Sequence, residues 1–111
     1  MGKKSLDKGK RVEREAVKLF KSLFEDVKRN WEEQMLRSCK RDLSNTYPLY
    51  IQIKAGKAPS WRKAMNEAEQ GVVEDKCPDE IPVGLTKQDG DEFYVHLKAK
   101  DFIALLQGDV A

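Results

Sequence analysis

The apolar residues near the N-terminus recur at the spacing of an α-helix, and this pattern constrains the fold more than any other feature of the chain. At about 100° per residue they fill one broad stripe, which is typical of an amphipathic helix packed on a core. The stripe predicts a helix over residues 6–27, with Ser5 or Asp7 as its N-cap. Its members are Val12, Ala16, Val17, Leu19, Phe20, Leu23, Phe24 and Val27.

Strand-like and helix-like segments then follow one another without a linker or a repeat. Residues 49–54 alternate between apolar and polar side chains, which indicates a strand, and Gly56 and Pro59 end it. Ser60 is a suitable N-cap for a second helix. The apolar positions of that helix are Trp61, Ala64, Met65, Ala68 and Val72.

The last third of the chain predicts a hairpin and a short helix. Strands over residues 81–85 and 93–97 flank Asp89-Gly90, a strong hairpin signal. Asp101 is placed to cap a closing helix over residues 102–107, and Gly108 follows as a C-terminal stop.

Together these segments predict a single domain over residues 1–111, with one mixed sheet in an α/β or α+β layer fold. Residues 28–41 stay open, because they either continue the first helix or form a loop and a short strand. With that strand the order is α, β, β, α, β, β, α.

Charge is distributed unevenly along the chain. The net charge is +2, but residues 1–41 carry thirteen Lys and Arg against seven Asp and Glu, whereas the remainder carries eight against twelve. This asymmetry fits a face that binds a polyanion beside a site that holds carboxylates. It is also common in domains that bind no nucleic acid.

Several classes of protein are excluded. No apolar run approaches the roughly 20 residues that span a bilayer, and the Lys-rich start lacks the apolar region of a secretory signal. Cys39 and Cys77 have no Cys or His at zinc-ligand spacing. We therefore expect a cytoplasmic protein with two free thiols and no membrane segment.

Two features of the sequence are anomalous. Glu13 falls inside the apolar stripe of the first helix, where a carboxylate needs a partner, a proton or a metal; the alternative is a charge favoured by the nearby helix N-terminus. Gln52 and Lys54 share one strand face, and Asp42 precedes a turn that brings it toward them. The alternative is that Gln52 and Lys54 line the solvent side of a half-buried strand and that Asp42 forms the turn.

Other polar residues have simpler interpretations. We interpret His96 as a surface histidine and Trp61 as a core or dimer anchor. The acidic residues of the second helix and its end are interpreted as a solvated face, with an accessory role for Glu67 only a guess. They are Glu67, Glu69, Glu74 and Asp75.

The order and spacing of these residues resemble the PD-(D/E)xK nuclease superfamily, and more closely the small phage and archaeal-type Holliday junction resolvases. Residues 8–15 read KGKRVERE, which is similar to the basic segment that opens the first helix of those enzymes. Asp42 and the run Gln52-Ile53-Lys54 correspond to their Asp and Glu-x-Lys core. The resemblance covers nearly the whole chain except residues 26–41.

The resemblance implies a restriction-endonuclease-like domain, a central mixed sheet flanked by helices, that hydrolyses phosphodiester bonds in branched DNA with Mg²⁺ or Mn²⁺. It implies Glu13, Asp42, Gln52 and Lys54 as catalytic residues, and metal ligation by Glu13, Asp42, Gln52 and the carbonyl of Ile53. Lys54 would orient the attacking hydroxide. DNA contacts are implied for Lys8, Lys10, Arg11 and Arg14, and a homodimer would supply two symmetric cuts, in the bacterial host if the protein is phage-encoded.

Two positions depart from the family pattern. Gln52 stands where the family has Glu, which removes a charge and should weaken metal affinity, and Arg41 stands where it has proline. The main alternative is therefore a non-catalytic or attenuated DNA-binding protein derived from a nuclease. A third interpretation is a partner-binding module that has no affinity for nucleic acid.

Overall fold

The computed structural model of this chain describes residues 3–30 and 39–108, with side chains described from residue 9 onward in those ranges. The helices are α1 (Lys3–Phe20), α3 (Trp61–Glu74) and α4 (Ala99–Gln107). The strands are β1 (Lys28–Arg29), β2 (Leu43–Ser44), β3 (Leu49–Gly56), β4 (Ile81–Gln88) and β5 (Phe93–His96).

Three of the strands form a mixed sheet in the order β3-β4-β5. β3 and β4 are parallel, with Leu49 opposite Ile81, and α3 is the crossover helix that parallel neighbours require. β4 and β5 are antiparallel. Gly90 between them has φ +77°, so the predicted hairpin at Asp89-Gly90 is confirmed.

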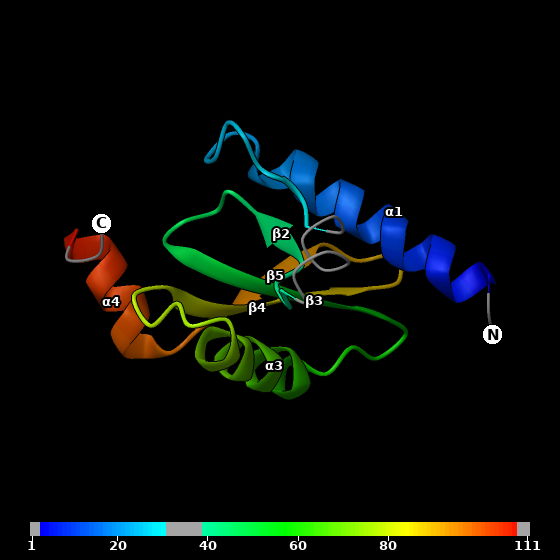
Figure 1. Cartoon of the computed structure of the whole chain (residues 1–111). Coiled ribbons are helices and arrows are strands. Elements are labelled where there is room, and N and C mark those ends of the chain that lie inside the picture. The colour runs from blue at the N-terminus through cyan, green and yellow to red at the C-terminus, as the bar shows by residue number, and fades with distance from the viewer. Residues whose placement is uncertain (1–2, 31–38, 109–111) are drawn as a thin grey trace.

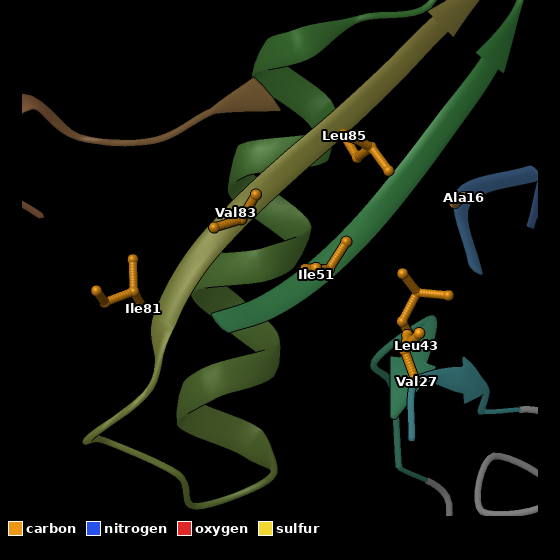
Figure 2. Packing of buried hydrophobic residues seen from close by; sticks show 7 residues of the cluster. All are labelled: Ala16, Val27, Leu43, Ile51, Ile81, Val83 and Leu85. Atoms are coloured by element: carbon orange, nitrogen blue, oxygen red, sulfur yellow. The ribbon is translucent and has the colours of Figure 1, made fainter. Parts of the chain in front are cut away.

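Helices cover both faces of this sheet, with α1 on one face and α3 on the other (Figure 1). On the α1 side, Ile51, Val83 and Leu85 belong to one buried cluster with Ala16 and Leu43 (Figure 2). A compact mixed α/β domain is therefore confirmed. No helix of the described residues is long and apolar enough to cross a bilayer.

The α3 face is packed more closely, because glycine stands where the helix meets the sheet. A Cβ on Gly84 of β4 would lie 2.9 Å from the Cβ of Ala64 and 3.1 Å from the backbone nitrogen of Met65. A Cβ on Gly71 of α3 would meet the ring of Tyr50. The helix therefore lies almost directly on the strand backbone.

The first helix ends earlier than predicted. The backbone nitrogens of Leu23 and Phe24 both donate to the carbonyl of Phe20, at 3.0 and 2.8 Å, in turns that close the helix. Val27 still reaches the core from the segment that follows, with 3% of its surface exposed. Its place in the apolar stripe therefore reflected burial, but burial outside the helix.

The prediction of a single sheet is also wrong in part. Residues 28–29 form the short strand that the sequence left open, and β1 and β2 make a separate antiparallel ladder.

The last helix begins earlier than predicted. The N-cap of α4 is Lys98, and Asp101, the predicted cap, lies in the first helical turn. Gly108 does end this helix, in the left-handed conformation with φ 74°.

We predict that Gly84→Ala destabilises the protein by about 1–3 kcal/mol, because the added methyl group has no space beneath α3. Gly9→Ala is the matched control, since nothing lies within 4 Å of its Cβ on α1 and alanine favours the helix by about 1 kcal/mol. Urea unfolding measures both. Equal stability of Gly84→Ala and the parent protein would contradict this packing.

Candidate active site

Asp42 is held beside β3 through both its main chain and its side chain. Its backbone nitrogen donates to the carbonyl of Ile51 at 3.0 Å, and its carbonyl accepts from the backbone nitrogen of Asn30 at 3.1 Å. Its Oδ2 accepts a hydrogen bond from the backbone nitrogen of Ile53 at 2.7 Å. The structure thus brings Asp42 to the middle of the Gln52-Ile53-Lys54 segment.

The residue before Asp42 is anchored separately. The two terminal nitrogens of Arg41 donate to the two carboxylate oxygens of Glu80 at 2.9 and 3.0 Å, and the guanidinium lies 4.8 Å above the ring of Tyr50. Burial alone would lower the pKa of Arg41, but the Glu80 carboxylate raises it above its ordinary value. Arg41 therefore stays charged and ties the chain beside Asp42 to the segment before β4.

Asp75, which follows α3, anchors Cys39 and Lys40, the two residues before Arg41. Its Oδ2 accepts from the thiol of Cys39 at 3.3 Å, from the backbone nitrogen of Lys40 at 3.0 Å and from the hydroxyl of Tyr50. Burial raises the pKa of this carboxyl, but these hydrogen bonds outweigh burial and lower its pKa. Asp75 was expected on a solvated face and instead has a structural role.

Gln52 is buried beneath α3, where it lies opposite Gly84 in the register. Only 6% of its surface is exposed, and its Oε1 has no hydrogen-bond partner among the described residues. The alternative that this side chain faces solvent is therefore wrong. A buried oxygen without a partner costs about 1–3 kcal/mol, so it is a feature that needs an explanation.

Lys54 lies on the same strand face and pairs with α3. Its Nζ is 2.8 Å from Oε2 of Glu67, and the two side chains are 36% and 45% exposed. Glu67 was grouped with the solvated residues of the helix. In the sequence, Glu67 directly precedes Ala68, an apolar position of the helix. This neighbour was the signal that Glu67 lies at the edge of the helix–sheet contact.

Glu13 is engaged in an ion pair with a strand residue. Its Oε1 lies 2.8 Å from Nε of Arg29, with the side chains 26% and 19% exposed. Arg29 stands opposite Leu43 in the β1–β2 ladder, so this pair lies next to β2. The sequence did not identify Arg29 because it falls in the segment left undecided.

The residues implied in DNA contacts lie on α1. Lys10, Arg11 and Arg14 are exposed, while the side chain of Lys8 lies outside the described residues. These exposed cations lie away from the core face of the helix, which carries Val12 and Ala16. They form a basic surface that is accessible to a large polyanion.

The described part of the chain holds no group of three or more His, Cys, Asp and Glu residues that could bind a metal. Of the four implied ligands, the structure places Asp42 beside Ile53 and keeps Glu13 with Arg29. In a strand the N–H and C=O of one residue point to the same side, so the carbonyl of Ile53 faces the edge on which Asp42 lies. Gln52 supplies a buried amide oxygen on the adjacent face.

Comparison of this chain with protein-family models, curated proteins and solved structures gives no match.

We predict that Asp75→Asn reduces the acid sensitivity of the fold. The pKa of Asp75 lies below its ordinary 3.8 in the folded state, so its stabilising contribution is present above pH 3.8 and is lost as the pH falls below 3.8 through the lower pKa of the folded state. The unfolding free energy of the parent should therefore fall more steeply below pH 3.8 than that of the variant. Urea unfolding at each pH measures this free energy. The same dependence on pH in the parent and the variant would show that these hydrogen bonds contribute nothing to the stability.

Proposed function

We propose that this protein is a metal-dependent endonuclease that hydrolyses phosphodiester bonds in branched DNA, of the Holliday junction resolvase type. The observation that carries the proposal is the hydrogen bond of 2.7 Å from the Ile53 backbone to the Asp42 carboxylate. It joins the two parts of the sequence motif, which are ten residues apart along the chain, and places the Asp42 carboxylate between Gln52 and Lys54.

The architecture agrees with this proposal. A mixed sheet with α1 and α3 on opposite faces is what the resemblance to PD-(D/E)xK nucleases implies (Figure 1). The restriction-endonuclease-like type is therefore part of the proposal. Gln52, Ile53 and Lys54 lie on β3, and Asp42 directly precedes β2.

Because the described residues hold no group of three His, Cys, Asp or Glu side chains that could bind a metal, Mg²⁺ or Mn²⁺ would be held weakly and with the help of DNA. Asp42, the carbonyl of Ile53 and the amide oxygen of Gln52 would hold it, and the unpartnered Oε1 of Gln52 is the observation that favours a ligand there. Mg²⁺ commonly uses one or two carboxylates together with water and substrate phosphates. The metal would neutralise the phosphate and activate water.

Lys54 would contact the scissile phosphate. Its ammonium is part-exposed and is held by Glu67, so it is both accessible and oriented. A fixed positive charge at this point stabilises the negative charge that develops during hydrolysis. Lys10, Arg11 and Arg14 of α1 would contact the DNA backbone, because exposed cations bind phosphates without regard to sequence.

The proposal includes a homodimer, because a symmetric pair of active sites is needed to cut a four-way junction twice. It also includes the cytoplasm of a bacterial host as the place of action, if the gene is carried by a phage. Both follow from the resolvase resemblance.

A second candidate is a DNA-binding protein that has lost catalysis. It is favoured by the engagement of Glu13 with Arg29 and of Glu67 with Lys54, which leaves few carboxylates to hold a cation. The two candidates differ in one measurable respect, which is cleavage in the presence of Mg²⁺ or Mn²⁺.

We predict metal-dependent nicking of a labelled four-way junction, with little cleavage in EDTA and at least a 100-fold loss in Lys54→Ala, as is typical when one charge-stabilising group is removed. Gln52→Glu should lower the Mg²⁺ concentration needed for half-maximal cleavage, because it adds a charged ligand. The readout is the initial rate of nicking on the junction and on a matched duplex.

Lys87→Ala is the matched control, since Lys87 is one register position beyond Thr86 and therefore on the opposite face of the sheet from Lys54. Equal cleavage by Lys54→Ala and the control would refute the site. Salt-dependent binding without cleavage in either metal would support the second candidate, whereas no DNA affinity at low salt would support a partner-binding module.

A further inference from the structure

A pocket of about 270 Å³ lies where β3 and β4 end and α3 begins. No step of the proposed hydrolysis uses it. Its walls come from the segment after β3, from α3, and from the neighbouring strands β4 and β5. They include Lys57, Pro59, Trp61, Thr86, Tyr94 and His96.

The strand register places this pocket beside Lys54. Lys54 is opposite Thr86, and Thr86 is opposite Tyr94, so the three side chains form a row on one face of the sheet. Neighbouring strands lie about 4.8 Å apart, so the ends of the row are separated by about 10 Å. One nucleotide spans such a distance between its phosphate and the outer edge of its base.

Aromatic surface is available in the walls of the pocket. The side chain of Tyr94 is 57% exposed and that of Trp61 is 48% exposed. The ring of Trp61 stacks on that of His96, with 5.9 Å between ring centroids and 23° between planes. Exposed aromatic rings are the surfaces on which unpaired bases stack.

Polar atoms lie next to these rings. Oγ1 of Thr86 and Nε2 of His96 are 2.9 Å apart, and both belong to residues that line the pocket. Burial lowers the pKa of His96 and so favours its neutral ring, in which one nitrogen donates and the other accepts; Nε2 already meets Thr86. Lys57 and Asp91 also line the pocket and contribute one positive and one negative charge.

We propose that this pocket, the flanking pocket, binds an unpaired nucleotide next to the scissile phosphate, with its base stacked on Tyr94. The inference rests on the proposed function and narrows the substrate class. A base held in a duplex must leave its stack before it can enter a concave site, whereas an unpaired base at a branch point enters without that loss. Among branched DNAs, a junction with an unpaired nucleotide at the branch should therefore bind more tightly than a fully paired junction.

Binding in EDTA tests this without cleavage. The probes are a branched DNA with one unpaired 2-aminopurine at the branch and a fully paired duplex of the same length. Tyr94→Ala should weaken binding to the branched probe by about 10-fold and leave duplex binding unchanged, because stacking is lost only where a free base exists. Tyr94→Phe should retain the affinity of the parent and its quenching of 2-aminopurine fluorescence.

Tyr47→Ala is the matched control, since Tyr47 is 51% exposed and precedes β3, at the opposite end of the strand from the flanking pocket. Equal affinities of Tyr94→Ala and the parent for the branched probe would overturn the inference and leave the nuclease proposal intact. A parent that binds neither DNA would overturn both. If Tyr94→Ala lost affinity equally for both probes and also changed from a dimer to a monomer in sedimentation, this face would be a contact between two copies of the protein. That result would overturn the inference.

Discussion

The close approach of α3 to the parallel strands β3 and β4 determines most of what surrounds the candidate site. Gly84 and Gly71 allow the helix to lie on the strand backbone, where any side chain would meet Ala64 or Tyr50. Because the helix is so close, Gln52 is covered and Glu67 reaches Lys54. The same contact sets Trp61 against His96 at the start of the helix, so one packing constraint shapes both the motif face and the flanking pocket.

The sequence predicted those helices and strands whose apolar residues recur with a clear period. The strands predicted over residues 49–54 and 81–85 are present and run to residues 56 and 88. They, the helix that begins after Ser60 and the turn at Gly90 were predictable because each is specified by local spacing and by a cap or turn residue. The end of the first helix was not, since Val27 keeps the helical spacing while the chain has already turned at Phe20. Periodicity reports which residues are buried, and burial does not require that the helix continue.

The candidate site was predictable only in part, because local sequence indicates turns but does not identify the partners that a residue meets in the folded chain. The approach of Asp42 to β3 follows from a turn between neighbouring segments, which local sequence can indicate. The partners of the charged residues could not be predicted, because Arg29, Glu67 and Glu80 meet Glu13, Lys54 and Arg41 only through tertiary contacts. An isolated charge in a sequence therefore indicates a need for a partner without identifying it.

The unpartnered oxygen of Gln52 has a consequence for the stability of the fold. A protein that leaves a buried acceptor unsatisfied is less stable than it would be with an apolar side chain of the same shape, by about 1–3 kcal/mol. A donor or cation that meets this oxygen would recover that free energy, so its binding would stabilise the folded protein. Stability alone would therefore disfavour an amide oxygen at this position.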